Sequence, residues 1–165
     1  VDYRAVEGRY TKVGSIEMIE AIGADQFGTF FATIDRLLAP GGRAAVQTIL
    51  VPEQRWERYR STPDWIERYV FPGCLIPSLE SLVRAAARHS QLAVYGVEEI
   101  GEHYAETLRQ WRSQFHARID DVRRLGYDRR FERTWDFYLA FCEAAFRTRM
   151  LRDAQLVLAR SGALG

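Results

Sequence analysis

The stretch that decides the fold is residues 10–51, YTKVGSIEMIEAIGADQFGTFFATIDRLLAPGGRAAVQTILV. Its first part, Tyr10 to Met18, is an apolar run typical of a strand. The part that begins at Gly23 carries apolar residues at helical spacing, and Pro40-Gly41-Gly42 ends the predicted helix. Residues 43–51 are mostly apolar, as expected of a strand that is buried on both faces. Strand, helix and strand in succession predict a layered α/β fold.

The remainder of the chain continues this alternation of strands and helices. The predicted elements are an insertion rich in Trp, Tyr, Arg and Pro (residues 52–77), a helix capped by Ser78 (79–89), a strand (91–101), two long helices (103–125 and 128–150) and a last strand (153–161). We therefore expect residues 1–165 to form one domain around a largely parallel sheet.

Composition excludes some classes of partner. The formal net charge is +1 and hydrophobic residues make up 47% of the chain, so no strong positive field favours nucleic acid. Cys74 and Cys142 lie far apart, and neither they nor the three histidines show a metal-binding spacing. No apolar run reaches transmembrane length and no signal peptide is recognisable. These features predict a cytoplasmic protein that binds no metal and meets a membrane, if at all, at its surface.

Two acids lie at the end of the first predicted strand, where a buried carboxylate would be costly unless something binds it. Ligands of such folds sit beyond the carboxyl ends of the strands, and Glu17 and Glu20 lie at that end of the first strand. Gln47, Thr48 and Ile49 lie at the same end of the second. Two interpretations stay open from position alone: solvated acids in a loop, or side chains that face a ligand.

Longer motifs resemble a known family. The segments YTKVGSIEMIEAIG, WIERYVFPGCLIPSLESL, HYAETLRQW and FYLAFCEAAFRTRMLRDAQLVLAR are similar, in order and spacing, to the C-terminal part of cyclopropane-fatty-acyl-phospholipid synthases and mycolic acid cyclopropane synthases. YVFPGCLIPS and FRTR are the most specific of these matches. The resemblance implies a Rossmann-like class I methyltransferase fold, of which this chain carries the C-terminal half of the sheet. Residues 52–77 and 103–150 would be helical insertions that shape an acyl pocket.

The resemblance also implies an activity. Members of the family transfer a methyl group from S-adenosylmethionine to the double bond of an unsaturated acyl chain of a phospholipid, and a cyclopropane ring results. A bicarbonate ion is thought to accept the released proton. By motif, Glu20, the backbone of Ile49 and Tyr104 match the residues that hold this ion. Gln47 is a departure, because relatives commonly carry histidine there, and an amide cannot take up a proton.

Further residues are assigned through the same resemblance. The expected cofactor-binding residues are Tyr3, Arg4, Ser15, Ile16 and Glu17. The expected acyl-binding residues are Trp65, Tyr69, Phe71, Phe137 and Phe141. Arginines of the first insertion would meet lipid phosphates at the inner membrane surface, and without the family match they would be ordinary solvated side chains.

One expected part of the family is missing from this sequence. The glycine-rich S-adenosylmethionine loop does not occur here, and the chain begins without Met, so we expect a truncated product that is inactive alone. The first strand would then be an exposed apolar edge, open to homodimerisation or pairing with another chain. Two alternatives to cyclopropanation stay open: a variant that gives a methyl or methylene branch, and a non-catalytic module that binds lipid or a partner.

Overall fold

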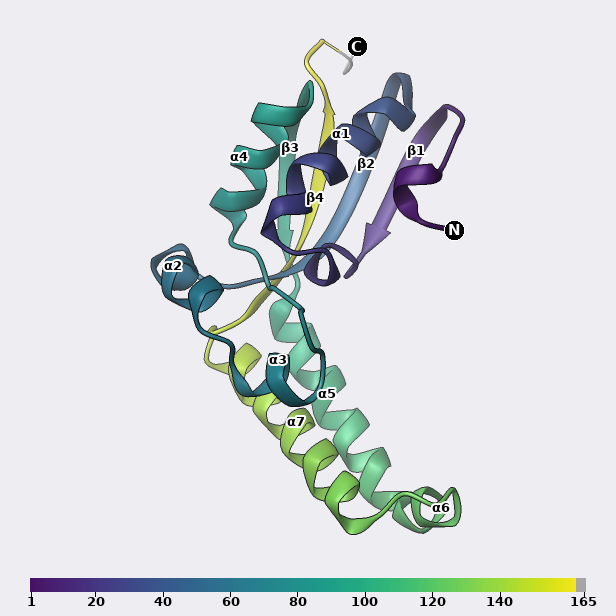
Figure 1. Ribbon diagram of the computed structural model, residues 1–165, viewed down its shortest axis with the longest axis vertical. Coiled ribbons are helices and arrows are strands. Elements are labelled where there is room, and N and C mark those ends of the chain that lie inside the picture. Colours follow the sequence, from purple (N-terminus) through teal and green to yellow (C-terminus); the bar gives the residue numbers. More distant parts are fainter. Residues whose placement is uncertain (163–165) are drawn as a thin grey trace. The chain divides into compact units, whose positions relative to one another are not determined.

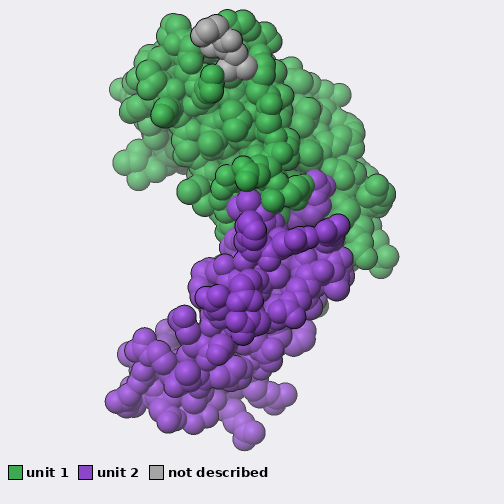
Figure 2. Space-filling model, turned by 180° about the vertical axis from the view of Figure 1, so that it is seen from behind, with its two compact units in different colours: residues 1–99, 153–165 green, residues 100–152 purple. Residues whose placement is uncertain are grey.

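The computed structural model describes residues 1–162, which divide into two compact units (Figure 2). The first unit contains Val1–Glu99 and the chain from Asp153 onward, and the second contains Ile100–Arg152. The predicted helical insertion at 103–150 therefore falls in the second unit, whereas the insertion at 52–77 belongs to the first. Among the described residues, no helix is long and apolar enough to cross a membrane.

A sheet forms the centre of the first unit (Figure 1). Within residues 1–162 its strands are β1 (Tyr10–Ile16), β2 (Leu38–Leu50), β3 (Leu92–Glu99) and β4 (Arg152–Arg160), in the spatial order β1-β2-β4-β3. β1 and β2 are parallel, and β3 and β4 are antiparallel. The predicted α/β class is confirmed, with a sheet that is mixed. The last strand in the sequence, β4, lies between β2 and β3 in the sheet. The order of the strands along the chain does not predict this position.

Two helices cover one face of this sheet. α1 (Phe27–Leu37) follows two 3-10 turns, η2 (Ile19–Ala21) and η3 (Ala24–Gln26), and packs against α4 (Leu79–His89) (Figure 1). The apolar stripe predicted for α1 is buried, with Phe30 and Phe31 at 2% and 1% exposure. The predicted cap of α4 is confirmed, because Ser78 and Ser81 form a reciprocal capping box.

β2 begins five residues before the predicted start. Tyr10 pairs with Leu38 and Lys12 with Arg43, so β2 carries a bulge across Pro40-Gly41-Gly42. Gly41 has a φ of 72°, and a side chain on Gly42 would lie 2.9 Å from the carbonyl oxygen of Ala39. The Pro-Gly-Gly segment thus ends α1 as predicted, but it also belongs to the strand.

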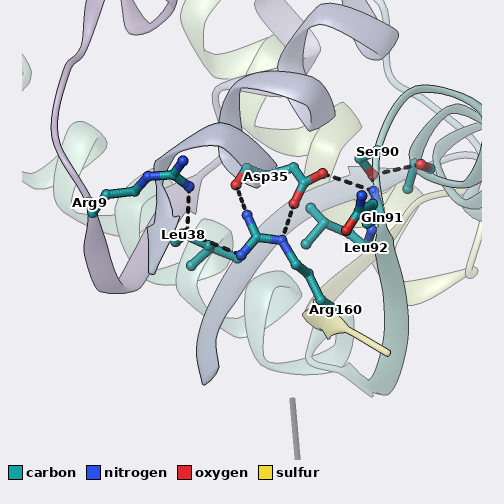
Figure 3. A network of polar contacts seen from close by, with 8 residues as sticks. Arg9, Asp35, Leu38, Ser90, Gln91, Leu92 and Arg160 are labelled. Carbon is teal, nitrogen blue, oxygen red and sulfur yellow. Dashed lines mark hydrogen bonds and ion pairs between the residues drawn. The ribbon is translucent and has the colours of Figure 1, made fainter. Parts of the chain in front are cut away.

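A polar network fixes the start of β2 against the end of β4 (Figure 3). Arg160 donates from Nε to Asp35 Oδ1 at 2.6 Å and from Nη1 to the carbonyl oxygen of Leu38 at 3.2 Å. The other carboxylate oxygen of Asp35 accepts from the backbone N–H of Gln91 at 2.9 Å. One carboxylate at the C-terminal end of α1 therefore ties together α1, β4 and the turn before β3.

The insertion after β2 contains α2 (Glu53–Ser61) and the short α3 (Trp65–Tyr69). Asp64 caps α3 by accepting from the backbone N–H of Glu67. Trp56 of α2 stacks on Phe27 with ring centroids 6.4 Å apart. An aromatic contact thus attaches the insertion to the core of the first unit.

The second unit consists of helices. α5 (Gly101–Ala117) packs along α7 (Arg129–Arg147), and α6 (Ile119–Arg124) lies between them in the sequence. Asp136 of α7 accepts from Arg112 and contacts His116, both on α5. The single helix predicted over 103–125 is broken at Arg118, and the helix predicted to reach residue 150 ends at Arg147. Arg149 then adopts a φ of 56°, a conformation that cannot continue a helix.

The outer edge of β1 is exposed, as the sequence predicted. Among the described strands β1 is paired only with β2, and Tyr10, Lys12 and Ile16 are all exposed. The edge is only partly apolar, because the charged Lys12 lies between Tyr10 and Ile16. Dimerisation or pairing through this edge stays a prediction.

Candidate active site at the carboxyl end of the sheet

Glu17 holds a strained position directly after β1. Its φ of 48° lies in the left-handed region, which costs a side chain about 1–2 kcal/mol. Its backbone N–H donates to the carbonyl oxygen of Gln47 at 2.9 Å, which extends the β1–β2 pairing by one residue. Beyond this point the chain turns sharply into η2. Strain of this kind is retained where the surrounding structure fixes the residue, often at a functional site.

Glu20 is buried, with 9% of its surface exposed. Its Oε1 accepts from the backbone N–H of Ile49 at 2.6 Å and from the hydroxyl of Thr48 at 2.9 Å. No donor within the described residues reaches its Oε2. Desolvation raises the pKa of this carboxyl above its usual value, and the nearby charge of Glu17 adds to that effect. The interpretation of Glu20 as a solvated loop acid is wrong.

Gln47 connects the acids of this edge. Its Nε2 donates to Glu17 Oε1 at 3.0 Å and to Asp153 Oδ2 at 3.2 Å. Its Oε1 accepts from Nε2 of Gln155 at 3.0 Å. This arrangement uses both amide hydrogens, and the reverse orientation of the amide would set its oxygen against two carboxylates.

Asp153 is the residue that sequence reasoning missed. It stands near the start of β4, is completely buried, and lies 106 positions after Gln47 in the sequence. Desolvation raises its pKa to about 7, and the negative charges of Glu17 and Glu20 act in the same direction. The one available signal was an acid next to an apolar strand, the same pattern that drew attention to Glu17.

The predicted cofactor residues lie along β1 and its N-terminal approach. The hydroxyl groups of Tyr3 and Ser15 are buried, and within the described chain neither has a hydrogen-bond partner. The Tyr3 ring packs edge-on against Phe30 at 5.9 Å. Arg4 instead forms an ion pair with Asp2, and Ile16 is 73% exposed at the sheet edge.

Tyr104 belongs to the second unit. It lies in the first turn of α5, where its ring stacks on Phe146 with centroids 4.8 Å apart and meets Trp111 edge-on. The acids and Gln47 belong to the first unit. The structure thus brings Glu17, Glu20 and Gln47 together, while the role of Tyr104 stays a prediction.

The predicted acyl-binding aromatics form one group in each unit. In the first unit Trp65 contacts Tyr69 at 5.8 Å, and Tyr69 and Phe71 are exposed. In the second unit Phe137 and Phe141 lie 6.0 Å apart on α7 and are also exposed. A contiguous patch of exposed apolar side chains often marks a binding surface, whereas single exposed ones are ordinary. Their contact with an acyl chain stays a prediction.

Comparison with known proteins defines the class first. The structure matches cyclopropane synthase MmaA2 from Mycobacterium tuberculosis with a TM-score of 0.84 at 21% identity, over 96% of this chain and 58% of that one. It matches coclaurine N-methyltransferase with a TM-score of 0.70 at 16% identity, over 96% of this chain and 51% of that one. Together with the sheet order, these likenesses define a class I methyltransferase fold.

Comparison of the amino-acid sequence with known proteins identifies the family. Residues 1–156 match the family described as mycolic acid cyclopropane synthetase, and the chain belongs to it. It is 42% identical over 161 residues to tuberculostearic acid methyltransferase UfaA1 of M. tuberculosis, which covers 98% of this chain and 38% of that protein. It is 29% identical over 159 residues to cyclopropane-fatty-acyl-phospholipid synthase of Escherichia coli, which covers 96% of this chain and 40% of that protein. The chain thus spans about two fifths of the length of these relatives.

Proposed function

We propose that this chain is part of an enzyme that transfers a methyl group from S-adenosylmethionine to the double bond of an unsaturated acyl chain of a phospholipid. Family membership supports this assignment. The observation that carries it is the group of buried carboxyls, Glu20 and Asp153 with Glu17 beside them, at the carboxyl end of the sheet. Methyl transfer to a double bond leaves a cation on the acyl chain, and fixed negative charge stabilises such a cation.

The residues along β1 fit the cofactor. The buried hydroxyl groups of Tyr3 and Ser15 lack partners, and the edge of β1 beside them is open. We infer that Tyr3, Arg4, Ser15, Ile16 and Glu17 hold S-adenosylmethionine, which supplies an electrophilic methyl group when bound. For Arg4 this requires the ion pair with Asp2 to rearrange or to remain beside the ligand.

The residues of the first unit do not fit a bicarbonate ion as they lie. The backbone N–H of Ile49 already donates to Glu20, and both amide hydrogens of Gln47 donate to carboxylates. Two buried oxygens lack a partner, Oε2 of Glu20 and Oδ1 of Asp153, and bicarbonate has a single O–H group, so it could donate to only one of them. No step of the proposed reaction is therefore assigned to bicarbonate.

Two products are compatible with methyl transfer to a double bond. A branched chain is favoured by the 42% identity to a methyltransferase named for tuberculostearic acid, a methyl-branched fatty acid. A cyclopropane ring, which the sequence alone favoured, is supported by the 29% identity to the E. coli synthase. We propose a methylene-branched product first, because the higher identity covers the same residues and because loss of a proton from the cation leaves a double bond; a saturated methyl branch would also require a hydride donor.

The proposed partner is a phospholipid at a membrane surface, reached from the cytoplasm. The insertion at 52–77 carries exposed aromatic side chains, Tyr69 and Phe71, beside four exposed arginines, Arg55, Arg58, Arg60 and Arg68. Aromatic rings suit the apolar boundary of a bilayer, and arginines suit its phosphates.

The experiment uses the protein expressed from its complete gene, S-adenosylmethionine with an isotopically labelled methyl group, and vesicles of dioleoylphosphatidylglycerol. We expect label in the acyl chains, and mass spectrometry after catalytic hydrogenation separates a methylene branch, which gains hydrogen, from a ring. Label confined to a soluble acceptor supplied in parallel would overturn the proposal.

A further inference from the structure

The first unit carries an open hollow at the end of the sheet where β1 and β2 begin and β4 ends. Its volume is about 650 Å³, within the range of pockets that bind small molecules. Leu38 at this end and Gln47 at the other stand nine residues apart on β2, so at the usual rise of a strand the two places are roughly 30 Å apart. The hollow is therefore separate from the carboxyl cluster.

The charges that line this basic hollow are unbalanced. Among the described residues its basic side chains are Arg9, Arg36, His89 and Arg160, and its one acid is Asp35. Asp35 is already engaged, because one of its oxygens accepts from Arg160 and the other from a backbone N–H. Within residues 1–162, neither Arg9 nor Arg36 forms an ion pair, and both bind carbonyl oxygens instead. Two permanently charged guanidiniums thus have no carboxylate to balance them.

Arg9 and Arg160 converge on one atom (Figure 3). Nη1 of Arg9 donates to the carbonyl oxygen of Leu38 at 3.1 Å, and Nη1 of Arg160 donates to the same oxygen at 3.2 Å. Because both nitrogens lie so near one oxygen, they are at most about 6 Å apart, a distance at which like charges repel each other. An anion placed beside them would relieve that repulsion.

The arginines keep N–H groups free for such an anion. Arg36 donates to the carbonyl oxygens of Val6 at 3.0 Å and Arg4 at 3.2 Å, so its guanidinium is held in place by the backbone. A guanidinium has five N–H groups, and the bonds to carbonyl oxygens use one of them in Arg9 and two in Arg36. The carbonyl end of α1 also attracts cations, but Arg160 already donates to two carbonyl oxygens there. A structural role therefore accounts for Arg160 and leaves Arg9 and Arg36 with unused donors.

The lining of the basic hollow indicates the class of ligand. The ring of His89 lies against α1 at Gly28, where a side chain would come within 2.8 Å of the ring carbons. His89 is the one aromatic ring among the described residues of the lining, so the hollow has no broad surface on which a nucleobase could stack. Guanidiniums suit phosphate, because their N–H groups match its several oxygens. A compact phosphate ester fits these features better than a nucleotide does.

We propose that the basic hollow binds a phosphate group and that Arg9 and Arg36 are its ligands. The phosphate belongs to a small soluble ester or to the head group of a membrane phospholipid, and both present the same charged oxygens to the two arginines. Arg160 positions the wall of the hollow through Asp35 and Leu38. This inference goes beyond the proposed function and does not rest on it, because binding here involves no methyl transfer.

The first test is calorimetric titration of the protein from the complete gene with glycerol 3-phosphate, and with glycerol as the neutral probe, at constant ionic strength. Arg9→Gln removes the charge and can still donate to the carbonyl oxygen of Leu38, so the fold should be kept. The control is Arg88→Gln, which removes the same charge from an exposed residue of α4 outside the hollow. If the ester is soluble, we expect it to bind where glycerol does not, and Arg9→Gln and Arg36→Gln each to weaken it at least about tenfold relative to Arg88→Gln.

The second test identifies the source of the phosphate by flotation with vesicles of dioleoylphosphatidylglycerol. If the head group is the ligand, Arg9→Gln and Arg36→Gln should lower the fraction of protein bound to vesicles, and Arg88→Gln should not. If the ester is soluble, all three variants should float equally and only the calorimetric titration should separate them. The proposal is overturned if neither glycerol 3-phosphate nor vesicles distinguish Arg9→Gln and Arg36→Gln from Arg88→Gln. Neither assay measures methyl transfer, so a failure here leaves the proposed function standing, and the reverse also holds.

Discussion

At the scale of single residues, the contribution of the buried Glu20 carboxylate to turnover can be tested by substitution. Glu20→Gln keeps the shape and one acceptor oxygen for Ile49 and Thr48, but it removes the negative charge. Because that charge would stabilise the cation of the acyl chain, we expect a loss of at least about tenfold in turnover, a modest part of what such groups supply. The measurement is lipid methylation at saturating substrate, with circular dichroism to verify the fold. Near-normal turnover would leave Glu20 with a structural role only.

Glu17 offers a second test at this scale, because its backbone conformation costs stability while its carboxylate belongs to the proposed active site. Glu17→Gly relieves the left-handed backbone and should raise the free energy of unfolding by about 1 kcal/mol, while lipid methylation falls. Glu17→Ala removes the same carboxylate but keeps the strain, so it should not share the gain. Denaturant titration of both variants decides the matter. Equal stability of the two would mean that the backbone at this position stores no strain.

Much of the site could be read from single residues. Acids at the end of an apolar strand predicted an unusual environment for Glu17 and Glu20, and both lie in the cluster. The sequence could not predict that Ile49 and Glu20 bind each other, since hydrogen-bond partners depend on the spacing of β1 and β2. Asp153 was missed for a related reason, because its partner lies 106 positions earlier in the chain.

At the scale of elements, one ion pair joins α1 to β4 (Figure 3). Arg160→Met removes the bonds to Asp35 and Leu38 and leaves a partly buried carboxylate with a backbone donor only. We expect a loss of roughly 1–3 kcal/mol in the free energy of unfolding, measured by urea titration. Arg84→Met breaks an exposed pair on α4 and should change stability by less than about 1 kcal/mol. Equal effects of the two substitutions would refute a structural role for the network.

Element types were predicted better than element boundaries. The helical spacing of α1 and the Ser78 cap of α4 are local signals, and both are confirmed. The early start of β2 was not predictable from propensity, because Pro40 and the glycines argue against a strand unless a bulge accommodates them. The break of α5 at Arg118 has no comparable sequence signal, since no glycine or proline stands there.

At the scale of the whole molecule, the central claim is that a carboxyl cluster on the first unit serves methyl transfer to a lipid. The chain belongs to the mycolic acid cyclopropane synthetase family and has a class I methyltransferase fold. Comparison of Glu20→Gln with Glu80→Gln distinguishes an effect of the carboxyl cluster on turnover from an effect of the change in net charge. Both substitutions remove one carboxylate, and only the first touches the buried edge of the sheet.

The most direct measurement is therefore the transfer of labelled methyl groups to dioleoylphosphatidylglycerol vesicles by the protein from the complete gene, compared among the wild type, Glu20→Gln and Glu80→Gln. We predict labelled acyl chains with the wild type and with Glu80→Gln, and a reduction of at least about tenfold with Glu20→Gln. A folded wild type that leaves the lipid unlabelled, or a Glu20→Gln that labels it as fast as the wild type, would contradict this account.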